Sequence, residues 1–237
     1  ALRGSMVALR GSMVALRGSM VALRGSMVAL RRSMQRPYGV IIFLLINSMK
    51  IFLETERLIL RQFTEADAEL LFQLDSDPEV TRFTKLGDRS GTPTPYNEIK
   101  NKFLPKVFRY YQQYPGYGFW AAIEKLSNKF IGWFHFRPGL DSYMGETLYR
   151  VDDIELGYRL QRKVWGKGYA TEGSKALIRK GFLELETQQV AASALSENKA
   201  SIRVIQKVGL KFELNFVYSE SQQAGVKYAL RKEDFKN

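Results

Sequence analysis

The sequence contains no cysteine and a single histidine among its 237 residues. Without cysteine the chain has no disulfide, no thiolate zinc site and no cysteine nucleophile, and one histidine excludes a metal site built from several histidines. The apolar run at residues 39–46 falls far short of the ~20 residues that a membrane span needs. We therefore expect no metal site and no stable membrane insertion, and a cytoplasmic location is the simplest interpretation.

The formal net charge is +12, but it is unevenly spread along the chain. Residues 1–48 carry seven arginines and no acid, which leaves +5 for the remainder. A mildly basic domain suits an anionic cofactor, and the sequence shows no basic stripe of the kind that a duplex-binding protein needs. We expect no nucleic-acid partner.

The first residues are four copies of Ala-Leu-Arg-Gly-Ser-Met-Val and a degenerate fifth copy, Ala29–Gln35. A glycine in each full copy costs a helix about 1 kcal/mol relative to alanine, and no charge pairing favours a coiled coil. We interpret residues 1–48 as a repetitive basic N-terminal extension, disordered or read through from upstream of a start at Met49. An export or transit segment and a functional arm are the alternatives.

Residues 49–237 are long enough to bury one sizeable core and alternate between strand and helix patterns. Strands are predicted at Arg57–Phe63, Gly118–Glu124, Phe130–Phe136, Ile154–Leu160, Val190–Leu195, Phe212–Tyr218 and Val226–Phe235. Helices are predicted after Thr64, at Pro78–Thr84, at Tyr96–Tyr114, and after Gly168 and Asn198, with a loop at 87–95 and a looser segment at Arg137–Arg150. A helix crossing between Ile154–Leu160 and Val190–Leu195 predicts that these strands are parallel neighbours. The pattern indicates a mixed α/β domain.

The most informative stretch is Trp165–Glu172, which joins a strand to an amphipathic helix through two glycines. Glycines let the backbone approach an anion, and the first N–H groups of a helix point at it. A dinucleotide fingerprint would need glycine at Thr171, and the Gly-Lys-Ser/Thr triplet of a P-loop is absent. The stretch therefore predicts a site for another phosphorylated cofactor.

Two blocks carry a family resemblance. Lys163–Gly168 fits the acetyl-CoA signature Gln/Arg-x-x-Gly-x-Gly/Ala, with lysine in the first place, and Asn198–Leu210 fits Asn-x-x-Ser-x-x-Val/Leu-x-x-Lys-x-Gly-Phe/Leu. Both resemble the GNAT superfamily of N-acetyltransferases. With the opening Leu53–Arg61, they are most similar to the branch that acetylates the N-termini of ribosomal proteins. The resemblance covers Met49–Asn237 and implies an acetyl-CoA-dependent N-acetyltransferase domain over 49–237.

The resemblance implies a central, mostly antiparallel sheet with flanking helices and one parallel strand pair that splays around the pantetheine arm of acetyl-CoA. Backbone N–H groups would bind the pyrophosphate and lysines would add charge, whereas Arg162 is as well explained by simple solvation. Asn198 would bind the pantetheine or cap its own helix. The residues expected to bind the cofactor are Leu160, Arg162, Lys163, Val164, Gly166, Lys167, Gly168, Tyr169, Ala170 and Asn198.

Glu155 is the candidate general base, because a carboxylate on the signature strand could take the proton of an ammonium directly or through water. Alternatively, Glu155 is a structural carboxylate that pairs with an arginine or lysine. Asp153 is the weaker candidate for the general base. Many superfamily members place a tyrosine where this chain has Ile205. Ser201 is therefore the candidate donor to the leaving sulfur, or else a small residue that packs against the cofactor.

Other conspicuous residues are expected to be structural. Glu172 should stabilise the N-terminus of its helix, and His135, between two phenylalanines far from both blocks, should be a surface or structural residue. Trp120, Trp133, Phe83 and Tyr149 are expected to pack in the core rather than line an acceptor pocket.

The expected reaction is direct transfer of acetyl from acetyl-CoA to a primary amine in a ternary complex. An amine-bearing peptide or protein N-terminus is the leading acceptor. A small-molecule amine and a non-catalytic acyl-CoA-binding module are the alternatives. Monomer and homodimer both fit the sequence.

Overall fold

The computed structural model describes residues 50–83, 92–142, 144–219 and 221–236. The interpretation of residues 1–48 lies outside this range, as do most of the predicted loop at 87–95 and the end of the helix predicted to reach Thr84. In the described part of the chain, no helix is both long and apolar enough to cross a membrane.

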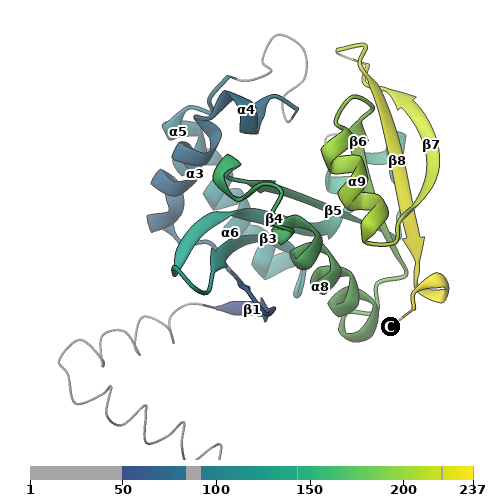
Figure 1. The fold of residues 1–237 in the computed structure, drawn as a ribbon, viewed down its shortest axis with the longest axis horizontal. Coiled ribbons are helices and arrows are strands. Elements are labelled where there is room, and N and C mark those ends of the chain that lie inside the picture. The colour runs from purple at the N-terminus through teal and green to yellow at the C-terminus, as the bar shows by residue number, and fades with distance from the viewer. Residues whose placement is uncertain (1–49, 84–91, 143, 220, 237) are drawn as a thin grey trace, which may run out of the picture. The chain divides into compact units, whose positions relative to one another are not determined.

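The described strands form one eight-stranded sheet in the order β1-β2-β3-β4-β5-β6-β8-β7 (Figure 1). The strands are β1 Ile51–Glu54, β2 Leu58–Arg61, β3 Gly118–Glu124, β4 Lys129–Pro138, β5 Asp153–Leu160, β6 Gln189–Leu195, β7 Lys211–Val217 and β8 Ala224–Arg231. Only β5 and β6 pair in parallel, and every other neighbouring pair is antiparallel. The predicted mixed, mostly antiparallel sheet with one parallel pair is confirmed.

The described helices follow the predicted order. They are α3 Ala68–Asp75, α4 Pro78–Thr81, α5 Tyr96–Glu98, α6 Leu104–Gln113, α7 Gly145–Leu148, α8 Tyr169–Glu184 and α9 Lys199–Lys207. Short 3-10 turns are η1 Glu65–Asp67, η4 Gly139–Asp141, η5 Arg162–Val164 and η6 Lys232–Asp234. Before α3, the predicted cap at Thr64 forms a capping box with Asp67, whose carboxylate accepts from the Thr64 N–H at 2.7 Å.

Three local predictions differ from the structure. The single helix expected over Tyr96–Tyr114 contains a π-helical stretch, Ile99–Phe103, between α5 and α6. Pro105 follows this stretch and has no N–H to donate, so the regular i→i−4 ladder is interrupted there. Strand β1 was not predicted, because Ile-Phe-Leu-Glu lacks strict alternation and β1 is a partly exposed edge strand. The segment expected to be loose after 136 continues β4 to Pro138 and then forms η4 and α7.

Alternation along β4 divides the core between the two faces of the sheet. Phe134 and Phe136 are fully buried on the face that packs against α8, together with Leu177 and Phe182. Trp133, one residue before Phe134, points to the opposite face, where a second core forms with α3 and α6. His135 shares the face of Trp133, so the strand pattern places it away from the α8 core.

The two parallel strands separate soon after they meet. Backbone pairing between β5 and β6 covers Asp153–Glu155 on one strand and Gln189–Ala191 on the other. Beyond Glu155, β5 stays paired with β4 as far as Leu160, whereas β6 stays paired with β8 as far as Leu195. The sheet therefore opens within its middle, as the splayed pair implied by the resemblance requires.

Candidate active site

The loop before α8 has the geometry of an anion site. Gly166 and Gly168 have φ angles of +74° and +87°, which L side chains rarely adopt. The first hydrogen bond of α8 runs from the Glu172 N–H to the Gly168 carbonyl at 3.0 Å, so the N–H groups before it have no intrahelical acceptor. A Cβ added at Gly166 would meet nothing within 4 Å, so the space beside this backbone is open. The loop thus fits a phosphate group.

Glu172 and Arg57 fasten this loop to the start of β2. The Glu172 carboxylate accepts hydrogen bonds from the Thr55 hydroxyl at 2.5 Å, the Arg57 N–H at 2.9 Å and the Arg57 Nε at 2.6 Å. Arg57 also donates through Nη1 to the Lys167 carbonyl at 3.0 Å. Burial opposes ionisation of Glu172, but these donors hold its pKa below its usual range. Arg57 was not among the predicted site residues, because the sequence marks it only as a basic residue just before a strand.

A groove of about 470 Å³ runs from the glycine loop along the end of β5 to α4 and α9. It is lined by seven of the residues predicted to bind the cofactor: Leu160, Val164, Gly166, Gly168, Tyr169, Ala170 and Asn198. Arg162, Lys163 and Lys167 are exposed beside it, and the Arg162 Nε lies 3.4 Å from the Asp77 carboxylate. The half-exposed indole of Trp165 donates its N–H to the Leu160 carbonyl at 2.8 Å.

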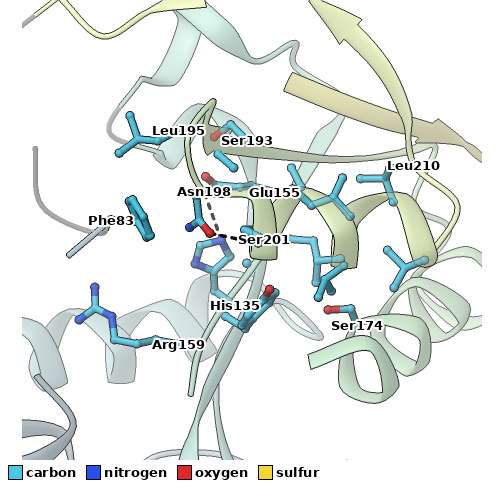
Figure 2. A pocket seen from close by; sticks show the side chains of 18 of the residues that line it. Phe83, His135, Glu155, Arg159, Ser174, Ser193, Leu195, Asn198, Ser201 and Leu210 are labelled. Atoms are coloured by element: carbon cyan, nitrogen blue, oxygen red, sulfur yellow. Dashed lines mark hydrogen bonds and ion pairs between the residues drawn. The ribbon is translucent and has the colours of Figure 1, made fainter. Parts of the chain in front are cut away.

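A second cavity of about 340 Å³ lies where β5 and β6 separate (Figure 2). Side chains from both faces of the sheet line it. His135 and Glu155 come from the face of α3 and α6, and Ser174 and Ile205 come from the helices on the other face. The cavity and the groove share lining residues, which are Phe83, Tyr158, Arg159, Asn198, Ser201 and Val204. The two spaces therefore adjoin each other at the start of α9.

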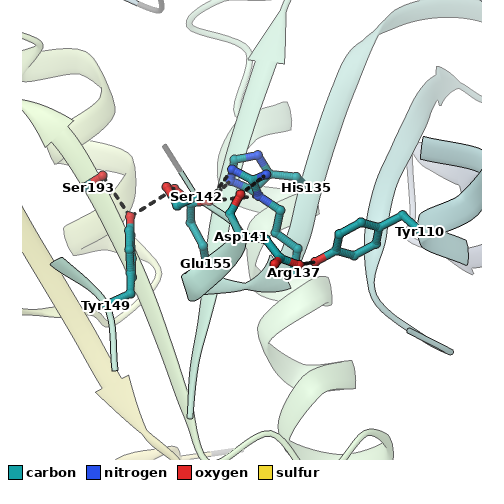
Figure 3. Close-up of polar contacts among 8 residues, drawn as sticks. All are labelled: Tyr110, His135, Arg137, Asp141, Ser142, Tyr149, Glu155 and Ser193. Carbon is teal, nitrogen blue, oxygen red and sulfur yellow. Dashed lines mark hydrogen bonds and ion pairs between the residues drawn. The ribbon is translucent and has the colours of Figure 1, made fainter. Parts of the chain in front are cut away.

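Glu155 stands at the last pair before the strands separate and is the centre of a polar cluster (Figure 3). Arg137 donates to its Oε2 through Nε at 3.0 Å and through Nη2 at 2.8 Å. The hydroxyls of Ser142 and Tyr149 each donate to Oε1 at 3.0 Å. Burial would raise the pKa of Glu155, but the positive charge of Arg137 and the hydrogen bonds from Arg137 and Tyr149 hold it below the usual range. Glu155 is thus both paired with an arginine and exposed to the cavity.

His135 faces Glu155 within the cavity. Its Nε2 lies 3.5 Å from Glu155 Oε2, and this nitrogen is buried without a hydrogen-bond partner among the described residues. Burial lowers the pKa of His135 to about 4. Sequence analysis assigned it a surface or structural role because it lies far from both blocks in the sequence. The antiparallel pairing of β4 with β5 places it opposite Gly157, which sequence spacing does not reveal.

Asn198 and Ser201 lie at the junction of the groove and the cavity. The Asn198 side chain accepts from the Ser201 N–H at 3.1 Å, so it does cap α9, while its side chain still lines both spaces. Burial raises the pKa of Tyr158, and a side-chain hydrogen bond with Ser201 acts in the opposite direction. Ile205, which stands where many superfamily members have a tyrosine, is buried in the cavity wall. The assignments of Asn198 to the cofactor and Ser201 to the leaving group stay predictions.

Asp153, the weaker candidate base, belongs to a separate and closed cluster. It is fully buried, and its carboxylate lies 2.6 Å from the Nζ of Lys227 and 2.6 Å from the Nε2 of Gln189. Lys227 is 1% exposed and also lies 3.0 Å from the Glu213 carboxylate. Asp153 lines neither the groove nor the cavity, so it is poorly placed to contact a substrate.

The four aromatic residues expected to pack in the core divide between two roles. Trp120 is 2% exposed and stacks on Phe52 in the core. Tyr149 also packs in a core cluster, where its hydroxyl lies 3.0 Å from the Glu155 carboxylate and 2.9 Å from the Ser193 hydroxyl. Trp133 and Phe83 line the cavity instead.

A helix start with the geometry of an anion site thus lies beside a sheet that splits between β5 and β6. The family model of the acetyltransferase (GNAT) domain matches residues 57–211, which is more than half of the chain. The chain belongs to the GNAT acetyltransferase family. It is therefore an acyltransferase, and the acetyl donor of its family is acetyl-CoA, a substrate that the glycine loop fits.

Similar proteins agree with this assignment. FsC-acetyl coenzyme A-N(2)-transacetylase of Aspergillus fumigatus is 27% identical over 189 residues, which cover 77% of each chain. A GNAT-family acetyltransferase from Bacillus anthracis is 26% identical with a TM-score of 0.60, over 76% of this chain and 98% of that one. RimL, a ribosomal L7/L12 alpha-N-protein acetyltransferase solved in complex with coenzyme A, is 17% identical with a TM-score of 0.62, over 78% and 100%. The likeness to RimL shows the fold alone.

Proposed function

We propose that this protein transfers the acetyl group of acetyl-CoA to a primary amine, most readily the N-terminal amine of a peptide or protein, by direct attack in a ternary complex. One observation carries the proposal. The groove that starts at the glycine loop adjoins a polar cavity lined by Glu155 and His135, and the two spaces share six lining residues. A donor anchored by its phosphates at the loop would extend toward the cavity, where an amine could meet it.

The residues of the groove would share the work of binding the donor. Within Val164–Ala170, the N–H groups of Val164 and Trp165 already donate to the carbonyls of Gln161 and Arg162. The N–H groups from Gly166 to Ala170 would therefore bind the pyrophosphate, at the positive end of the α8 dipole and beside the open space at Gly166. Lys163, Lys167 and Arg162 would add positive charge from the exposed side of the loop. The end of β5 around Leu160 and the amide of Asn198 would bind the pantetheine arm, since both line the groove.

Two residues that line the cavity would transfer the protons of the reaction. An α-amine has a pKa of about 8, so only a minority is uncharged at neutral pH, and its nitrogen must lose a proton for the amide to form. Glu155 would supply the negative charge that draws this proton away, directly or through an intermediate group. Ser201 would donate toward the departing sulfur, which Ile205 cannot do.

The choice of a peptide N-terminus rests on the resemblance of Leu53–Arg61 and Asn198–Leu210 to the ribosomal-protein branch. A specific observation favours a second candidate, a small-molecule amine. The relative in Aspergillus fumigatus aligns over 77% of its own length. Its name, an N(2)-transacetylase for FsC, specifies a numbered nitrogen of the acceptor, as the names of small molecules do. Both acceptors would use the same groove and the same polar cluster, and they would differ in what fills the rest of the cavity.

The test is release of coenzyme A thiol by the full chain, supplied with acetyl-CoA and one acceptor at a time. The acceptors are peptides that begin with Ser, Ala or Met, the same peptides with a blocked N-terminus, polyamines and amino sugars. We expect turnover with free but not with blocked peptides. Turnover with polyamines or amino sugars alone would establish the second candidate instead. Acetyl-CoA binding without acceptor-dependent turnover across the panel would contradict the proposal.

A further inference from the structure

The reaction as proposed assigns no role to His135. This residue is the single histidine of the sequence, and it lines the cavity beside Glu155. Its ring is held in place from several sides. Phe119 and Trp133 pack against it, with ring centroids 5.6 Å and 5.8 Å away. A Cβ added at Gly157 would lie 2.5 Å from Nε2, so the ring fits only because residue 157 is a glycine. Such tight placement suits a group whose position matters.

Glu155 is poorly prepared to accept a proton directly. Two N–H groups of Arg137 and the hydroxyls of Ser142 and Tyr149 already donate to its two oxygens. These donors stabilise the charged carboxylate, and each would lose strength if Glu155 were protonated. The charge of Glu155 is nevertheless close enough to influence its neighbours, because Oε2 lies 3.5 Å from the His135 ring.

His135 has complementary properties. Burial keeps its pKa low, Glu155 opposes this effect, and the positive charges of Arg137 and Arg159 add to it. The ring is therefore neutral at neutral pH and one nitrogen carries a lone pair. The negative charge of Glu155, 3.5 Å from Nε2, favours the tautomer of the neutral imidazole that carries its hydrogen on Nε2. Nδ1 then holds the lone pair, and Figure 2 shows the other ring nitrogen turned away from Glu155, toward the side of Phe83.

We propose that His135 is the proton acceptor of the reaction, and that Glu155 is a positioning residue that orients the imidazole and stabilises the imidazolium that forms. This inference rests on the proposed acetyl transfer. The amine nitrogen bonds to the thioester carbonyl carbon, the carbon–sulfur bond breaks, and the proton of the nitrogen moves to Nδ1. The Ser201 hydroxyl gives a proton to the departing sulfur and regains one from water, while the imidazolium returns its own proton to water, so the enzyme is unchanged.

The weak basicity of His135 does not prevent this step. An attacking amine nitrogen becomes much more acidic as its bond to the carbonyl carbon forms, so a weak base within reach is able to take its proton. A low pKa also keeps the imidazole unprotonated before the acceptor arrives, which a histidine of ordinary pKa near 6.5 would not ensure in mildly acidic conditions.

The test compares His135→Gln and His135→Ala with the full wild-type chain, using the acceptor on which the wild type turns over. We expect kcat to fall by about 10²-fold or more in both variants, because a positioned general base contributes about 10²–10⁴-fold, while acetyl-CoA affinity stays unchanged. Added imidazole should restore part of the rate of His135→Ala. Pyrrole, a ring of the same size without a basic lone pair, should not. Lys129→Gln, at the exposed start of the same strand, is the matched control.

The outcomes separate this inference from the proposed function. If the wild type turns over and His135→Gln keeps at least a third of its kcat, His135 is not the proton acceptor while the transferase assignment stands. Rescue of His135→Ala by pyrrole as well as imidazole would show that the ring only fills space, and would overturn the inference. If the wild type acetylates no acceptor, the proposed function fails and this inference fails with it. Acetyl-CoA binding by each variant reports that it is folded.

Discussion

The cofactor groove and the reaction cavity adjoin each other, but the sequence builds them in different ways. The anion site of the groove consists of backbone N–H groups from one continuous stretch, in which two glycines and a helix start determine the geometry. The cavity instead collects side chains from strands and turns that meet only in the folded sheet. Its polar cluster comprises His135, Arg137, Ser142, Tyr149, Glu155 and Ser193. Backbone sites can thus be recognised from spacing, whereas side-chain sites depend on register.

The largest expected effect is on the affinity of the glycine loop for acetyl-CoA. Gly168→Asp should abolish measurable acetyl-CoA binding, because it places a side chain and a negative charge at the start of α8, where φ is +87°. Gly168→Asn is the matched control, since asparagine has nearly the same shape, tolerates positive φ and carries no charge. Isothermal titration calorimetry with coenzyme A measures both affinities. Binding by Gly168→Asp as tight as by Gly168→Asn would show that charge at this position is irrelevant to the ligand.

The two carboxylates of β5, Asp153 and Glu155, should differ in whether they affect stability or the reaction rate. Asp153→Asn should lower the free energy of unfolding by about 3–5 kcal/mol, because it leaves the buried ammonium of Lys227 with a weaker set of partners. The folded fraction should keep a normal kcat, since Asp153 lines neither space. Urea unfolding and thiol release measure the two quantities. Asp152→Asn, at the exposed neighbouring position, should change neither. A large loss of kcat with unchanged stability would place Asp153 in the reaction after all.

Glu155→Gln should produce the reverse pattern, with kcat lower by about 10²-fold and acetyl-CoA affinity almost intact. The substitution removes the charge beside His135 and keeps a side chain of similar size. It should also lower the pKa of His135 further, because the Glu155 charge acts to raise it. NMR titration of the single imidazole measures that pKa directly. The exposed Glu146→Gln is the control. Equal losses of rate and affinity would indicate a structural role for Glu155.

The smallest expected effect is on kcat, at Ser201, where the groove and the cavity adjoin. Ser201→Ala should reduce kcat by about tenfold, because water can in part replace a hydroxyl that donates to the departing sulfur. The cap of α9 should persist, since the bond to Asn198 comes from the Ser201 backbone N–H. Steady-state kinetics with acetyl-CoA measure the change. An unchanged kcat would favour the alternative role of Ser201, close packing against the donor.

The comparison also explains what could be predicted from the sequence. The succession of strands and helices along the chain and the parallel pair followed from alternation and a crossover helix, and the glycine loop followed from spacing. Neither signal identifies which side chains meet across strands. Alternation does place His135 on the face opposite Phe134, but only the register of β4 with β5 brings it to Gly157 and Glu155. Arg57 was missed for the same reason, since its contact with Glu172 joins residues 115 positions apart.

The indole of Trp165 has an optical consequence. The chain has three tryptophans: Trp120 is buried in the core, Trp133 lines the cavity, and Trp165 is 47% exposed at the groove. Its N–H occupies the carbonyl of Leu160, which belongs to the strand end expected to meet the pantetheine arm. A ligand that pairs with that carbonyl must share it or displace the indole, and either event changes the surroundings of an emitting ring. Occupancy of the groove can therefore be followed by intrinsic fluorescence, without a label and without turnover, and Trp165→Phe supplies the blank.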